Sequence, residues 1–161
     1  MSFNQEKSVV LESILGRMRR TKNVELSAIR IIVRRDFGRK SCAIEVRNDQ
    51  SITDLDLAIR TGLNYDTWDH CSAFFERKPW SSKCLVEIYP DGSAPGQLKP
   101  ISSLPLMKGD ILSYVYDFGD NIAHSVTVEE IRPVESLTLY PLVTTLNKSY
   151  RSPKKSRKKT C

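Results

Sequence analysis

The spacing of apolar residues near the N-terminus predicts an amphipathic helix over residues 6–20. Apolar side chains recur there every three or four positions, which is the period of one helical face, and charged residues occupy most of the other side. Such a helix packs either on its own domain or on a partner, and a second copy of the chain is one such partner. The apolar positions are Val10, Leu11, Ile14, Leu15 and Met18.

The period then shortens to two residues, which is typical of half-buried strands. Apolar residues occupy every second position over residues 29–34 and again over residues 42–47. The turn-forming segment 36–40 separates the two runs, so the pattern predicts a β-hairpin.

A second helix is predicted between Ser51 and Gly62. Ser51 followed by Asp54 is typical of an N-cap with an acidic first turn, and Gly62 is a common C-terminal stop. The helix is expected to cross the sheet on one apolar face. That face carries Leu55, Ala58, Ile59 and Leu63.

Three further strands are predicted in the second half of the chain, at residues 84–89, 111–118 and 126–131. Residues 90–96 are rich in Pro and Gly and predict a loop, and residues 119–121 predict the turn of a hairpin. The predicted order is therefore strand, strand, helix, strand, strand, strand. This order indicates the α+β class, with one helix crossing a mixed sheet.

The length of 161 residues favours one domain with flanking segments over two domains. Residues 1–23 contain the N-terminal amphipathic helix, and residues 24–135 form the domain. Residues 136–147 are an apolar extension that lies against the core or against a partner. Residues 148–161 combine Lys and Arg with Ser and Pro and have almost nothing to bury, so a disordered basic tail is predicted.

Charge is distributed unevenly along the chain. The net charge of +6 favours an acidic partner, yet residues 41–147 carry 15 acidic and eight basic residues. The positive charge therefore lies in the flanks, and the tail is a nuclear-localisation signal, a nucleic-acid arm or a solubilising segment. The candidate nucleic-acid-binding residues are Arg17, Arg19, Arg20, Arg34, Arg35, Arg39, Lys40, Lys154, Lys155, Arg157, Lys158 and Lys159.

The sequence contains no recognisable catalytic motif. It has no nucleophile elbow and no phosphate-binding Gly-rich loop, and its four cysteines are too widely spaced for a zinc ribbon or a disulfide framework. A non-enzymatic protein without a cofactor or a bound metal is therefore expected. The alternative is a metal or catalytic site built from the two histidines and their acidic neighbours. Its residues would be Asp69, His70, Asp120 and His124.

The same residues also have a structural interpretation, which we favour. Asp117 and Asp120 would bond backbone amides of the hairpin turn, Gly119 would supply a positive φ, and His124 would bond across the strands.

Several aromatic residues lie between residues 68 and 89. They belong either to the core or to an exposed recognition patch, because aromatic side chains often anchor interfaces. They are Trp68, Phe74, Phe75, Trp80 and Tyr89.

Three segments resemble the plasmid pRiA4b ORF-3-like family. Residues 69–75 resemble the family's Asp-His-Leu-x-x-Phe segment, and the loop reaching Leu104 and Gly109-Asp110 resembles its approach to the last hairpin. Residues 116–124 are similar to its Tyr-Asp-Phe-Gly-Asp-x-Trp-x-His block. The motif residues are Tyr116, Asp117, Phe118, Gly119, Asp120 and His124, and Ile122 stands in place of the Trp.

The resemblance spans residues 24–132 and implies a β-grasp-like (ubiquitin-like) fold, in a family found on plasmids, in transposon-associated genes and in some eukaryotic proteins. It leaves both basic flanks outside. Because Ile122 replaces the family's Trp, no role for an exposed ring is expected at that position.

These observations favour a non-enzymatic protein-interaction adaptor of nucleic-acid-associated complexes. A direct nucleic-acid-binding accessory factor related to transposon or plasmid proteins is the alternative, and a metal-dependent enzyme using Asp120 and His124 is third. A chain without a membrane-crossing run or a secretory signal is expected to be intracellular, in the nucleus if eukaryotic and otherwise in the cytoplasm. The candidate partner-binding residues are Val10, Ile14, Met18, Trp68 and Trp80, and the N-terminal helix could also form a homo-oligomer.

Overall fold

The computed structural model describes residues 24–146, which form one sheet, one α-helix and one short 3-10 helix. The predicted helix at residues 6–20 and the predicted tail at residues 148–161 lie outside the described residues. The elements are β1 (Ser27–Arg35), β2 (Ser41–Arg47), α2 (Ile52–Leu63), β3 (Ser72–Phe75), β4 (Cys84–Ile88), η1 (Ile101–Ser103), β5 (Ile111–Tyr116), β6 (Ile122–Pro133) and β7 (Leu142–Thr145).

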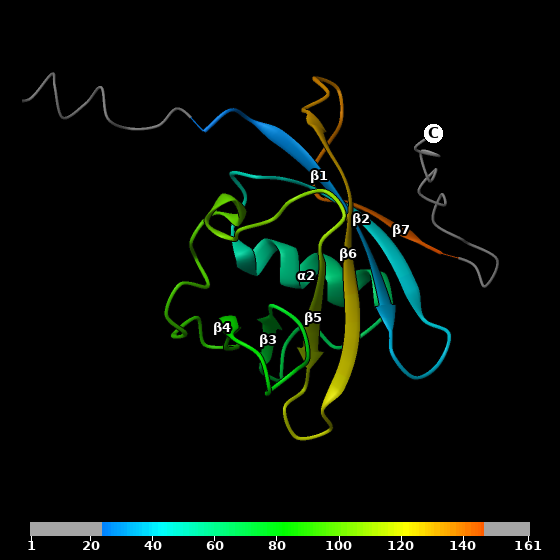
Figure 1. Cartoon of the computed structure of the whole chain (residues 1–161), viewed down its shortest axis with the longest axis vertical. Helices are drawn as coiled ribbons and strands as arrows, with labels where there is room; N and C mark the ends of the chain where they lie inside the picture. The colour runs from blue at the N-terminus through cyan, green and yellow to red at the C-terminus, as the bar shows by residue number, and fades with distance from the viewer. Residues whose placement is uncertain (1–23, 147–161) are drawn as a thin grey trace, which may run out of the picture.

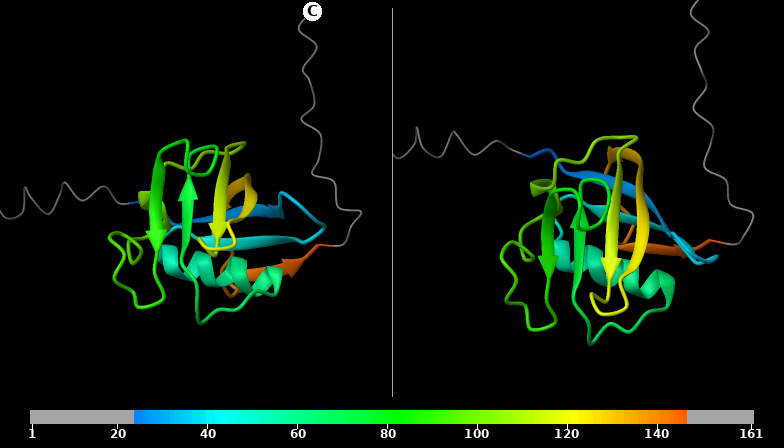
Figure 2. Two further views of the ribbon diagram at one scale, coloured as in Figure 1. Left: turned by 90° about the horizontal axis from the view of Figure 1, so that it is seen from below. Right: turned by 60° about the horizontal axis from the view of Figure 1, so that its bottom comes forward.

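The sheet has the strand order β4-β3-β5-β6-β1-β2-β7 and curves around the helix (Figures 1 and 2). The α+β class is confirmed. All six strand pairs among the described residues are antiparallel, so the expectation of a mixed sheet is wrong. The β-grasp arrangement, which was expected together with a mixed sheet, is not confirmed.

Helix α2 begins as the sequence predicts. Ser51 accepts a hydrogen bond from the backbone N–H of Asp54 at 3.0 Å, and the Asp54 carboxylate accepts one from the N–H of Ser51 at 2.9 Å. This reciprocal pair is a capping box, which satisfies two backbone donors that a helix start leaves unpaired. The predicted start of the helix is therefore confirmed.

The C-terminus of α2 differs from the prediction. The helix continues through Gly62 to Leu63, and Asn64 adopts the left-handed cap conformation with φ of 57°. Gly62 is required by packing, because a Cβ there would lie 2.8 Å from the Sγ of Cys42 on β2 and 2.9 Å from Cγ1 of Val143 on β7. The absence of a side chain therefore lets the helix approach the sheet closely.

The core lies between α2 and the inner face of the sheet. Burying these apolar side chains is the main stabilising contribution to such a fold. Its largest fully buried apolar members include Ile31, Ile44, Ile52, Ile59, Phe74 and Ile101.

Two strands were not predicted. Strand β3 has four residues, all buried, so it shows no alternation of apolar and polar positions. Strand β7 lies at the edge of the sheet and pairs with β2, and it comes from the apolar extension at residues 136–147. Val143 of that extension packs against the core, as one of the two interpretations of the extension expects.

Within residues 24–146, no helix is long and apolar enough to cross a membrane.

Candidate functional site

Three connections lie together at one end of the molecule, where β5 turns into β6 (Figure 1). We call residues 36–40, 64–71 and 117–121 the loop end. The backbone N–H of Asp36 donates to the carbonyl of Ala123 at 3.0 Å, which joins the first connection to β6. The other two connections contain parts of two of the three segments that resemble family motifs.

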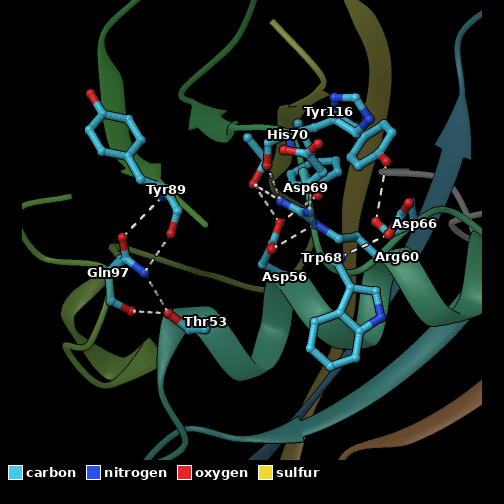
Figure 3. Close-up of polar contacts among 12 residues, drawn as sticks. Thr53, Asp56, Arg60, Asp66, Trp68, Asp69, His70, Tyr89, Gln97 and Tyr116 are labelled. Atoms are coloured by element: carbon cyan, nitrogen blue, oxygen red, sulfur yellow. Dashed lines mark hydrogen bonds and ion pairs between the residues drawn. The ribbon is translucent and has the colours of Figure 1, made fainter. Parts of the chain in front are cut away.

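A buried arginine on α2 holds the loop of residues 64–71 in place (Figure 3). Arg60 donates to the backbone carbonyl of Asp69 at 2.7 Å and to that of His70 at 3.0 Å. Its Nε lies 2.9 Å from Oδ2 of Asp56, an ion pair without hydrogen-bond geometry. A buried charge is costly unless it is paired, so this arrangement stabilises one position of the loop.

Besides this ion pair, Asp56 accepts two hydrogen bonds inside the protein. The hydroxyl groups of Ser72 on β3 and Tyr114 on β5 each donate to its Oδ1 at 2.5 Å. Burial raises the pKa of the Asp56 carboxyl, while the positive charge of Arg60 and the two hydroxyl donors act in the opposite direction. All these polar groups are used in joining α2 to the sheet and the loop.

His70 and Asp117 meet across the loop end. His70 Nδ1 lies 3.2 Å from Asp117 Oδ2, and both side chains are partly exposed. Both backbones are left-handed, with φ of 72° and 59°, a conformation that costs free energy in residues other than glycine. The contact joins two of the three motif segments, and the two residues are separated by more than 40 positions in the sequence.

The hairpin turn follows the structural interpretation in part. Asp117 Oδ1 accepts hydrogen bonds from the backbone N–H groups of Gly119 at 2.9 Å and Asp120 at 3.2 Å, as expected for Asp117. The expectation that Gly119 supplies a positive φ is wrong, because the left-handed residues are Asp117 and Asn121, with φ of 59° and 52°. Asn and Asp tolerate this conformation better than most residues.

His124 lies in the core on β6. One ring nitrogen lies 3.1 Å from the carbonyl of Tyr114 and the other 2.9 Å from the hydroxyl of Tyr65. Burial lowers the pKa of His124, so the neutral ring is favoured. The predicted hydrogen bond across the strands is confirmed, and both ring nitrogens face protein groups. Asp120 is exposed, and no cluster of three metal-ligating side chains occurs in residues 24–146.

The predicted aromatic residues divide between core and surface. Phe74 and Phe75 are buried, whereas 87% of Trp68 is exposed. Trp80 is half exposed: its indole N–H donates to Asn121 at 2.8 Å, and its ring packs edge-on against Phe75. Trp68 and Trp80, both predicted to bind a partner, therefore lie in different environments.

A second polar cluster fixes a loop away from the loop end. The side chain of Gln97 accepts hydrogen bonds from the N–H groups of Tyr89 and Ala94 and donates to the hydroxyl of Thr53 at 3.3 Å (Figure 3). Gln97 is almost fully buried. This cluster attaches the predicted loop of residues 90–96 to the start of α2.

The basic residues predicted to bind nucleic acid divide between half-buried and exposed positions. Arg34 and Arg35 are half-buried at the end of β1, while Arg39 and Lys40 are exposed in the β1–β2 turn. Arg39 and Lys40 line a cavity of about 570 Å³, together with residues 61–64 and 145–146. The remaining predicted contacts lie outside the described residues. They are Arg17, Arg19, Arg20, Lys154, Lys155, Arg157, Lys158 and Lys159 for nucleic acid and Val10, Ile14 and Met18 for a partner.

Sequence reasoning missed the pair that organises the site. Asp56 and Arg60 are spaced i, i+4, and each directly follows an apolar residue of the predicted helix face, Leu55 or Ile59. Oppositely charged residues at that spacing commonly form an ion pair along a helix. The signal was therefore present in the sequence.

Comparison with known proteins connects this geometry to one family. A sequence model described as "Plasmid pRiA4b ORF-3-like protein" matches residues 23–152. The crystal structure of MM3350, a protein of unknown function from Methanosarcina mazei Go1, is similar in fold, with a TM-score of 0.59 and 20% identity over 75% of this chain and 69% of that chain. A search of curated proteins finds no match.

Proposed function

Because the chain belongs to the plasmid pRiA4b ORF-3-like family, which matches it over residues 23–152, we propose that the loop end built by the family's motif segments is a protein-binding surface. In this proposal the protein is a non-enzymatic adaptor that contacts its partner through Trp68. The basic flanks direct the complex to nucleic acid or to the nucleus.

The exposure of Trp68 on a fixed loop carries this proposal. Figure 3 shows the indole ring pointing away from the network around Arg60. The loop is held on both sides of Trp68. Before it, the hydroxyl of Tyr116 donates a hydrogen bond to the carbonyl of Asp66 at 3.2 Å. After it, Arg60 donates hydrogen bonds to the carbonyls of Asp69 and His70. A pre-organised loop loses little conformational entropy on binding, and an exposed Trp is a typical interface anchor.

The charge around Trp68 indicates the chemistry of the partner. The loop end contains five aspartates and only two residues of the Lys/Arg class. An acidic surface repels a phosphate backbone and attracts Lys and Arg side chains. A protein segment that places an apolar side chain beside basic residues fits this surface best.

Binding measurements on full-length protein test this proposal. The full-length protein is first purified together with its bound partner, and the partner is identified. The affinity of the two purified proteins for each other is then measured by calorimetry. Trp68→Ala should weaken binding by at least tenfold, the effect expected for a central aromatic anchor. The matched control is Leu98→Ala, since Leu98 is 71% exposed in a loop outside the loop end.

The control should bind as the wild type does, and both variants should retain the wild-type unfolding free energy. Equal affinities of wild type and Trp68→Ala for the partner would contradict the proposed surface.

A direct nucleic-acid-binding role is the second candidate. The cavity beside Arg39 and Lys40 favours it, because Leu146 also lines that cavity and the basic residues 148–161 follow shortly after. In this candidate the β1–β2 turn itself binds phosphates, and the tail only adds to the affinity. DNA affinity that persists without the tail but falls on replacement of Arg39 and Lys40 would favour this role.

A further inference from the structure

The end of the molecule opposite the loop end carries exposed apolar side chains. Leu137 is 96% exposed and Leu139 is 89% exposed, both in the connection between β6 and β7. Val24 and Leu26, which precede β1, and Ile131, near the end of β6, are also exposed. We call these five residues the leucine patch.

Hydrogen bonds bring the segments of the leucine patch together around the turn after β2. The side chain of Asn48 accepts from the N–H of Ser27 at 3.2 Å and donates to the carbonyl of Glu25 at 2.8 Å. The side chain of Gln50, two residues later, donates to the carbonyl of Tyr140 at 3.1 Å. Figure 1 shows the start of β1 and the β6–β7 connection at this same end.

Pairing of β1 with β6 places Ile131 in the same region. Ser27 is opposite Pro133, and Ile29 is opposite Ile131, so the residues before β1 lie beside those after β6. Single exposed apolar residues are common, but a group gathered from three segments at one end of a protein indicates a contact surface.

We propose that the amphipathic segment of residues 6–20 in the same chain covers the leucine patch. The described chain starts at Val24, which is itself a member of the patch. Residues 21–23 can span at most about 10 Å, and a helix of residues 6–20 would be about 22 Å long. The predicted helix can therefore reach the patch without leaving this end of the molecule.

The chemistry of the two surfaces is complementary. The segment offers five apolar residues on one face, and such a face is stable in water only when another surface covers it. Its last turn contains Arg17, Arg19 and Arg20, while Glu25 is exposed close to the patch. Opposite charges at the rim favour this contact over one with the basic tail.

Photocrosslinking in the full-length chain tests the proposal. A benzophenone amino acid replaces Leu137, and irradiated protein is digested with trypsin. The expected crosslink joins residue 137 to the peptide of residues 8–17, which carries most of the apolar face, within a single chain of 18.4 kDa. The same probe at Phe37, which is 87% exposed at the loop end, is the matched control and should give no crosslink to this peptide.

A full-length variant, Ile14→Asp with Met18→Asp, should reduce the yield of the crosslink at least fivefold. The matched variant Glu6→Gln with Glu12→Gln changes the polar side and should retain it. Crosslinks that join two chains, shown by mixing light and isotope-labelled protein, would identify a second copy as the occupant and overturn the proposal. The absence of a crosslink to residues 1–23 would also overturn it. The result is independent of Trp68, so it leaves the proposed function unaffected.

Discussion

At the level of single residues, burial decides the role of the two histidines. His124 occupies a core position where both ring nitrogens contact protein groups, whereas His70 lies at the surface beside Asp117. Their sequence contexts are similar, since each lies in a motif segment near an aspartate. The tertiary environment therefore separates a structural histidine from one that partners and solvent can reach.

The lowered pKa of His124 predicts a pH-dependent stability. In the unfolded chain the ring takes up a proton near pH 6.5, whereas in the folded chain it does so only at lower pH. The neutral buried ring therefore contributes its full stability above about pH 6.5, and this contribution is lost as the pH falls below that value.

Urea unfolding of wild type and His124→Asn between pH 7.5 and 5 tests this expectation. The variant should be less stable at pH 7.5, and its unfolding free energy should fall less steeply with decreasing pH. An unchanged slope would show that His124 does not cause the dependence.

At the level of elements, the contact between α2 and the strands β2 and β7 depends on Gly62. In an isolated helix Ala is more favourable than Gly by about 1 kcal/mol. Here the added Cβ would overlap with Cys42 and Val143. Overpacking of this kind outweighs the gain in helix propensity, because the sheet cannot move without disturbing its strand pairing.

Gly62→Ala should therefore destabilise the protein by about 1–3 kcal/mol in urea unfolding. Thr61→Ala, at the neighbouring exposed position, is the control and should change stability by less than about 0.5 kcal/mol. Adding Cys42→Ala to Gly62→Ala should recover part of the loss, because it removes one of the overlapping atoms. A stabilised Gly62→Ala variant would refute the close contact.

At the level of the whole molecule, positive and negative charges are separated along the chain. Residues 24–146 contain 17 acidic and 13 basic residues, whereas residues 147–161 contain seven basic and no acidic ones. The described domain therefore repels polyanions overall, and the tail attracts them.

For the adaptor we expect DNA binding to depend on the tail. Deleting residues 148–161 should reduce the affinity for duplex DNA at least tenfold at low salt, and wild-type binding should weaken steeply as salt is raised. Arg39→Gln with Lys40→Gln leaves the tail intact and should change the affinity by no more than about threefold. Affinities are measured by fluorescence-anisotropy titration. A large loss of affinity on replacing Arg39 and Lys40, with little loss on deleting the tail, would favour the direct nucleic-acid role.

Several features were predictable from the sequence because their signals are local. The two-residue period predicted the hairpin of β1 and β2, and the Ser51–Asp54 spacing predicted the start of α2. The block at residues 116–124 predicted the β5–β6 hairpin and the family. Each of these signals depends on residues close together in the chain, so the sequence by itself determined them.

Only the tertiary structure decided the order of the strands and the composition of the loop end. The all-antiparallel sheet, the short buried β3 and the edge strand β7 depend on pairings between distant segments, which local periods do not encode. The contact of His70 with Asp117 and the exposure of Trp68 depend on where Arg60 holds the loop. The sequence therefore determined the family and the elements that have local signals, and long-range packing decided the remaining strands and which side chains reach the surface together.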